Sequence, residues 1–141
     1  MQPDNTELVR EVIGALNRGD VDGMLARLDP DFEWTPLEDS PIAGTHRGHA
    51  RVRRYVEDWL STFEGLRLET EELTELDDRV LVVVRGRARG RGSGLELDNH
   101  FCQVWTLRGD TAVSLQEYAT REQALAAQRA ADGEAEPRRS R

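Results

Sequence analysis

One carboxylate in this sequence lies among apolar residues and could carry acid–base chemistry. Glu117 follows Val113 and Leu115 at alternate positions of a strand-like segment, so the three share a face. An apolar pocket strips water from a charged carboxylate and raises its pKa toward the range that general acid–base catalysis needs. Glu117 is therefore the candidate catalytic acid or base. The alternative, a carboxylate that closes the pocket rim or pairs with an arginine, stays open.

A second polar candidate, Gln103, belongs to residues 95–107, another strand-like segment. One face of that strand is far more apolar than the other, and we expect it to point inward. This inward set is Leu95, Leu97, Asn99, Phe101, Gln103, Trp105 and Leu107. Gln103 would then share the pocket with Glu117, as a second catalytic candidate that orients a substrate carbonyl.

The turn at residues 108–110 decides whether these two strands present the expected faces. A three-residue loop would place Trp105 opposite Val113, whereas a two-residue turn would reverse the faces and bring His100 inward. The greater hydrophobicity of the set that contains Trp105 favours the three-residue loop.

Large side chains supply the candidate substrate-binding wall. The expected set is Trp34, Tyr55, Trp59, Phe101, Trp105 and Leu115. Such a wall suits a flat, apolar molecule, and the same residues could equally fill a core.

The histidines and the cysteine do not form a convincing site. His46 and His49 are three residues apart, but no third ligand has suitable spacing, so we expect no metal. His100 and Cys102 lie on the outward face of their strand, where exposure to solvent or burial in a dimer is expected.

Hydrophobic periodicity predicts helices at residues 6–18, 21–28, 49–63 and 120–131, with Thr6 or Asn5 capping the first and Asp20 the second. Strands are expected at 31–36, 66–76, 79–89, 95–107 and 111–119. This order predicts an α+β fold, in which a curled sheet wraps the helices and leaves a conical cavity.

Composition limits the classes of function. The chain has 141 residues, a net charge of −8 and one cysteine, and all 19 basic residues are arginines, which excludes Schiff-base chemistry and a P-loop lysine. We expect one domain over residues 1–131, followed by a disordered tail at 132–141. No membrane span or secretory signal is visible, so a cytoplasmic location is expected.

The arginine- and glycine-rich segment at residues 84–94 superficially resembles a nucleic-acid-binding motif. It continues an apolar strand and contains no aromatic residue, and the net charge opposes phosphate binding. We expect Gly86 and Ala88 to face the cavity, and the outward Arg85, Arg87 and Arg89 to pair with acids such as Glu96 and Asp98 across the strands. No nucleic-acid partner is therefore expected.

Three stretches carry a family resemblance: "RGDVDGMLARLDPDFEWTP", "GTHRGHARVRRYVEDWL" and "VWTLRGDTAVSLQEYATREQALAA". They resemble the SnoaL-like branch of the nuclear transport factor 2 (NTF2)-like superfamily. The resemblance implies a cone in which a curved antiparallel or mixed sheet wraps three N-terminal helices, with a short C-terminal helix. It also implies a homodimer and a pocket that works without a cofactor.

The resemblance leaves the activity open, because the same fold carries cyclases, isomerases, hydrolases and non-catalytic modules. The positions that resemble the acid and phenol sites of ketosteroid isomerase-like members hold Val12, Pro36 and Gln103, so that mechanism is not supported. Asp39 lies in a loop that could reach the cavity mouth. The expected function is a cofactor-independent cyclase, isomerase or hydrolase for an apolar or polycyclic substrate; the alternative is a non-catalytic ligand-binding or dimerisation module.

Overall fold

The computed structural model describes residues 4–38 and 44–135, and of residues 133–135 the backbone alone. The helices are α1 (Asn5–Asn17), α2 (Val21–Leu25), α3 (His49–Thr62) and α4 (Arg121–Ala135). The strands are β1 (Leu28–Thr35), β2 (His46–Arg47), β3 (Phe63–Leu76), β4 (Arg79–Gly90), β5 (Glu96–Arg108) and β6 (Thr111–Tyr118). The predicted α+β order is thus confirmed, with the short β2 as an addition.

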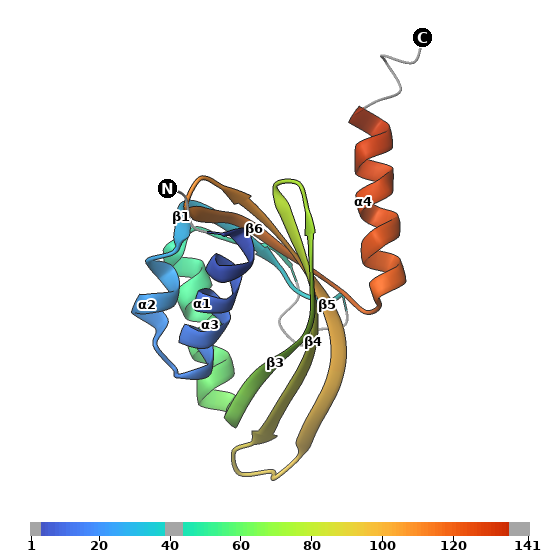
Figure 1. Cartoon of the computed structure of the whole chain (residues 1–141). Coiled ribbons are helices and arrows are strands. Elements are labelled where there is room, and N and C mark those ends of the chain that lie inside the picture. The colour runs from blue at the N-terminus through green and yellow to red at the C-terminus, as the bar shows by residue number, and fades with distance from the viewer. Residues whose placement is uncertain (1–3, 39–43, 136–141) are drawn as a thin grey trace.

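The six strands form one mixed sheet in the order β2-β1-β6-β5-β4-β3. Strand β1 runs parallel to β6, and every other neighbouring pair is antiparallel. Strand β3 gains extra residues against β4 at two points, between Glu64 and Arg67 and between Thr70 and Glu72. Such bulges bend a strand, and the sheet is strongly curved (Figure 1).

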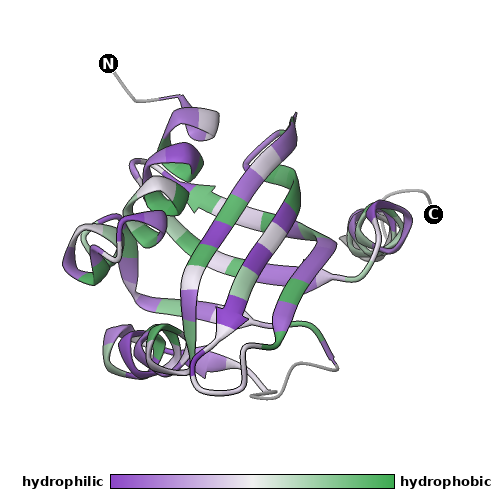
Figure 2. Ribbon diagram, turned by 90° about the horizontal axis from the view of Figure 1, so that it is seen from below, coloured by the Kyte–Doolittle hydropathy of each residue, from purple (hydrophilic) through white to green (hydrophobic). Residues whose placement is uncertain are grey.

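Helices α1, α2 and α3 cover the concave face of the sheet, and α4 lies alone on the other side (Figures 1 and 2). Apolar and polar residues alternate along the strands, as Figure 2 shows. Inward residues such as Val9, Phe32, Val52 and Val82 make the main core. The fold is therefore the expected cone.

Local signals place the first two helices. Asp20 caps α2 as predicted, accepting a hydrogen bond from the Gly23 amide at 2.9 Å. The cap of α1 is Asp4, not Thr6 or Asn5: the Asp4 carboxylate accepts a hydrogen bond from the Thr6 amide at 3.0 Å. Gly19 stops α1 with a φ of 72°.

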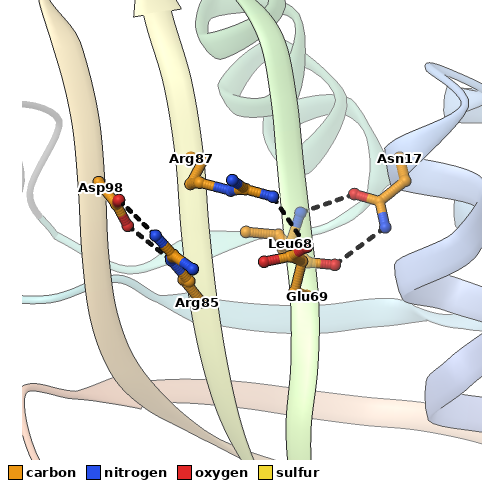
Figure 3. Close-up of polar contacts among 6 residues, drawn as sticks. All are labelled: Asn17, Leu68, Glu69, Arg85, Arg87 and Asp98. Carbon is orange, nitrogen blue, oxygen red and sulfur yellow. Dashed lines mark hydrogen bonds and ion pairs between the residues drawn. The ribbon is translucent and has the colours of Figure 1, made fainter.

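Asn17, the last residue of α1, ties the helix to the sheet. Its side-chain amide donates to the Leu68 carbonyl at 3.0 Å, and its oxygen accepts from the Leu68 amide at 2.8 Å (Figure 3). Leu68 lies on β3, whose outer edge has no further strand. Asn17 thus occupies two backbone groups that would otherwise be left open on an edge strand.

The β5–β6 hairpin departs from the predicted geometry. Arg108 pairs with Thr111, so the turn has two residues and not three, and Trp105 lies opposite Leu115 instead of Val113. A register shift follows between Thr106 and Leu107, where Val113 is the extra residue on β6. This bulge restores the expected faces, and Ala112 enters the core in place of Val113.

The arginines of β4 face outward and are paired, as the sequence predicts. Arg85 makes two bonds to Asp98 at 2.7 and 2.8 Å (Figure 3), and Arg89 reaches Glu96 at 3.4 Å. Arg87 pairs with Glu69 at 2.8 Å. Up to Gly90 the arginine- and glycine-rich segment is an ordinary strand, and the charges of Arg85, Arg87 and Arg89 are neutralised across the sheet.

Helix α4 packs on the outer face over a second, smaller core of Leu81, Cys102, Val104 and Ala124. It runs to Ala135 and so continues past residue 131, where the sequence pattern placed its end. Asp132, within this extension, pairs with Arg79 at 2.8 Å. Residues 136–141, the rest of the expected tail, lie outside the described part of the chain.

Candidate functional site

A cavity of about 360 Å³ opens between the concave face of the sheet and helices α1 and α3. A volume of this size can hold a small organic molecule. Five aromatic side chains line it: Trp34, Tyr55, Trp59, Phe63 and Phe101. The wall is therefore mostly apolar, and its few polar groups decide what the cavity can do chemically.

Four of these aromatic rings form a row in which each ring contacts the next. Tyr55 meets Trp34 edge-on with ring centroids 5.0 Å apart, and meets Trp59 edge-on at 6.5 Å. Trp59 stacks on Phe63 at 4.9 Å. Rings that support each other in this way form a rigid surface for a flat ligand.

Glu117 is the acidic side chain in the cavity wall. It lies on β6 directly opposite Gln103 of β5, and its carboxylate accepts a hydrogen bond from the Gln103 amide nitrogen at 3.0 Å. On its other side, β1 places Trp34 opposite Leu115, which shares the inward face with Glu117. The carboxylate therefore sits between two strands, beside the aromatic wall.

Burial raises the pKa of Glu117 to about 7. Loss of water around the carboxylate is the largest cause, and the side chain keeps partial exposure because it opens onto the cavity. The hydrogen bond from Gln103 and the nearby N–H groups of Leu37 and Trp34 favour the charged form and offset part of this effect. A carboxyl group that titrates near neutrality can both accept and donate a proton.

Gln103 is almost fully buried, and its orientation is fixed by Trp105. The Trp105 indole N–H donates to the Gln103 side-chain oxygen at 3.0 Å. An indole nitrogen can only donate, so the amide nitrogen of Gln103 must face Glu117. Gln103 thus positions Glu117 and uses its own carbonyl oxygen on Trp105, whereas the sequence suggested that it would orient a substrate.

The expected site residues divide into two groups. Trp34, Tyr55, Trp59, Phe101 and Glu117 line the cavity together. Gln103, Trp105 and Leu115 lie on the same face but are not part of that cavity wall; Gln103 and Trp105 instead face a small void in the core.

Several lining residues were not expected from the sequence. They include Leu16, Leu37, Phe63, Leu66 and Leu68. Phe63 looked like the end of a helix, but it begins β3. Asn99 also lines the cavity, as its place in the inward set of β5 predicts.

The histidines are placed individually and do not form a cluster. His46 stacks on Tyr55 with centroids 4.4 Å apart, and His49 bonds through its ring nitrogen to the Leu28 carbonyl at 3.0 Å. His100 lies on the outer face, 3.3 Å from Glu71. Over residues 4–38 and 44–135, no three side chains of the His, Cys, Asp or Glu type are grouped as a metal would require.

Cys102 was expected to face solvent or a dimer partner. It is instead buried beneath α4 of the same chain. Burial raises the pKa of its thiol to about 11. The His100 and Cys102 pair is therefore not a nucleophile and base. Asp39 lies outside the described residues.

The structure combines a curved mixed sheet, helices on its concave face and an apolar cavity between them. The model of the SnoaL-like domain matches residues 9–115. The chain belongs to the SnoaL-like family. None of the helices in the described residues is long and apolar enough to cross a membrane.

Solved structures agree with this SnoaL-like fold. TerC, crystallised with polyporic acid, is 25% identical, with a TM-score of 0.73 over 82% of this chain and 91% of TerC. An NTF2-like protein from Burkholderia pseudomallei is 27% identical, with a TM-score of 0.73 over 86% and 94% of the two chains. One from Burkholderia xenovorans is 28% identical, with a TM-score of 0.69 over 84% and 90%. A comparison with curated proteins finds no match.

Proposed function

We propose that this SnoaL-like protein binds a small apolar or polycyclic molecule in its cavity and acts on it by acid–base catalysis at Glu117, without a cofactor. The observation that carries the proposal is a carboxylate with a pKa of about 7 in an aromatic cavity of about 360 Å³. The complex of TerC with polyporic acid supports a small-molecule ligand for this fold.

In the proposed reaction, the Glu117 carboxylate removes a proton from a carbon of the substrate and returns it elsewhere on the molecule. Proton transfer of this kind serves isomerisation and cyclisation, and transfer to or from water serves hydrolysis. Gln103 holds the carboxylate in place, and the aromatic wall of Trp34, Tyr55, Trp59 and Phe101 positions the rings. Trp105 and Leu115 support this arrangement from the core.

Exchange of carbon-bound hydrogen tests the proposal without knowledge of the natural substrate. We expect the protein to accelerate deuterium exchange into β-tetralone, a bicyclic ketone with acidic C–H groups, in heavy water followed by NMR. Glu117→Gln should remove the acceleration, and the exposed-site control Glu75→Gln on β3 should keep it.

The alternative function is a non-catalytic ligand-binding module. Burial of the polar pair Gln103 and Glu117 is compatible with a purely structural role for the pair. If β-tetralone binds and no exchange is accelerated, this alternative is favoured over catalysis.

We also propose that the protein is a cytoplasmic homodimer. The outer sheet face outside α4 carries alternating arginines and acids, including Arg85, Arg87, Glu69 and Asp98, which a symmetric copy could pair with in turn. A monomer by sedimentation at micromolar concentration would refute the dimer.

A further inference from the structure

Glu117 lacks a cationic partner. No ion pair joins its carboxylate to any residue in the described part of the chain, and no positive charge contributes to its pKa. The basic residue that lines the cavity is Arg87, and its guanidinium is bound to Glu69 at 2.8 Å on the outer face of the sheet. A carboxylate withdrawn from water is normally paired with a cation or protonated.

The hydrogen-bond donors around Glu117 also leave it incompletely satisfied. Gln103 supplies the hydrogen bond of 3.0 Å. The Leu37 amide and the Trp34 indole also favour the charged form, but the buried indole nitrogen makes no hydrogen bond with a described residue. An ionised carboxylate has acceptor sites for about four donors. Its unfilled sites are available on the side that opens onto the cavity.

The wall around the carboxylate has the same electrostatic preference. Trp34, Tyr55, Trp59, Phe63 and Phe101 line the cavity, and the face of an aromatic ring carries negative charge density that attracts cations where another ring does not cover it. Three ring contacts of 4.9 to 6.5 Å hold four of these rings in place before a ligand arrives. The net charge of −8 adds a long-range attraction for positive molecules.

These features discriminate between ligand classes. An anionic ligand would bring like charges together, and a neutral ligand such as a ketone gains no charge pairing from an ionised Glu117. A positively charged nitrogen complements both the carboxylate and the ring faces. We propose that the cavity binds an apolar molecule carrying one amine or quaternary ammonium group, with Glu117 as its counter-charge. This inference rests on the proposed function, since it takes the same cavity as the ligand site.

A pair of probes that differ only in charge tests the inference: benzyltrimethylammonium and its hydrocarbon isostere, neopentylbenzene. Binding of each is followed at about pH 8, where Glu117 is mostly ionised, by the fluorescence of the cavity tryptophans Trp34 and Trp59. We expect the cation to bind the wild-type protein at least about tenfold more tightly than the hydrocarbon.

Matched variants locate the effect. Glu117→Gln should weaken binding of the cation about tenfold and leave the hydrocarbon unchanged, because it removes the charge and keeps the shape. Glu75→Gln makes the same chemical change on an exposed residue near the opposite end of β3 from Phe63, and should leave both probes within about twofold.

Each other outcome is decisive. If the hydrocarbon binds as tightly as the cation, or Glu117→Gln weakens both equally, the charge preference is refuted while the cavity stands as an apolar ligand site. If neither probe binds the wild-type protein, the ligand site itself is refuted, and the proposed function falls with it.

Discussion

At Glu117, two opposing effects set the state of one carboxyl group. Loss of water favours the protonated form, whereas the hydrogen bond from Gln103 and the nearby N–H groups of Leu37 and Trp34 favour the ionised form. Desolvation is the larger effect, so the pKa rises from 4.5 to about 7. The protein therefore keeps this group near the midpoint of its titration at neutral pH.

The raised pKa predicts how stability depends on pH. The folded state binds the Glu117 proton more tightly than the unfolded state, so this group stabilises the fold below about pH 4.5 and that stabilisation is lost as pH rises to about 7. Its contribution is on the order of 3 kcal/mol. Urea unfolding of the wild type and of Glu117→Gln should therefore show a difference in unfolding free energy that moves in favour of the variant across this window. A constant difference would contradict the raised pKa.

Gln103 and Trp105 should affect Glu117 to different degrees. Gln103→Leu removes the amide that stabilises the charged form, so the pKa of Glu117 should rise further, by about one unit. Trp105→Phe keeps the amide but frees it to rotate, and the pKa should rise less. Carbon NMR titration of labelled glutamate measures both. Equal pKa values of Glu117 in the wild type and in Gln103→Leu would show that the hydrogen bond does not stabilise the ionised carboxylate.

At this scale, the sequence predicts which way side chains face more reliably than which of them meet a cavity. Alternation on β5 identified the inward set correctly, because one face is visibly more apolar. It could not show that Trp105 would donate a hydrogen bond to Gln103, and Gln103 one to Glu117, beneath the cavity wall. That outcome depends on how deep each position lies beneath helix α1.

At the scale of elements, one side chain replaces a missing strand. Asn17 presents an amide donor and an amide acceptor to Leu68, which copies the pairing that a neighbouring strand would provide (Figure 3). The contact fixes the end of α1 against β3, and both elements line the cavity through Leu16 and Leu68. Cavity shape therefore depends on this contact.

Asn17→Leu should destabilise the fold by about 1–3 kcal/mol, because two partly buried backbone groups of Leu68 lose their partners. Asn5→Ala, at the other end of α1, is the control and should change stability by much less. Thermal unfolding compares the two. Hydrogen exchange should also show faster exchange at the Leu68 amide in the first variant; unchanged exchange there would refute the role of Asn17.

The sequence predicted the helices and long strands because their periodicities are strong over many residues. It did not predict β2, since two residues carry no period, nor the cap at Asp4. The hairpin between β5 and β6 was predicted with the wrong turn. A two-residue turn followed by a bulge gives the same facing as the three-residue loop, so alternation alone cannot separate them.

At the scale of the whole molecule, the sheet carries a core on each face. Helices α1 to α3 cover the concave side, and α4 covers Leu81, Cys102 and Val104 on the other (Figure 1). The sequence could not assign α4 to this side, because its short apolar pattern fits either face. The apolar outward residues Cys102 and Val104 were the available signal.

The cover provided by α4 predicts the reactivity of the single cysteine. Cys102 is buried and its pKa is raised to about 11, so the native protein should resist alkylation by iodoacetamide at about pH 8. A chain ending at Thr120 lacks α4 and should react at least about tenfold faster, as mass spectrometry would measure. Equal rates in a truncated chain that keeps its circular dichroism would contradict the packing of α4.

The extra residue at Val113 has a consequence for how relatives are compared. It sets the parity of β6, so that Glu117, and not Gln116 or Tyr118, enters the cavity. A relative with the same strand length but no bulge would align without a gap and still present the neighbouring side chain to its ligand. Functional residues on this strand should therefore be transferred between members of the family by counting from the bulge, not from the turn.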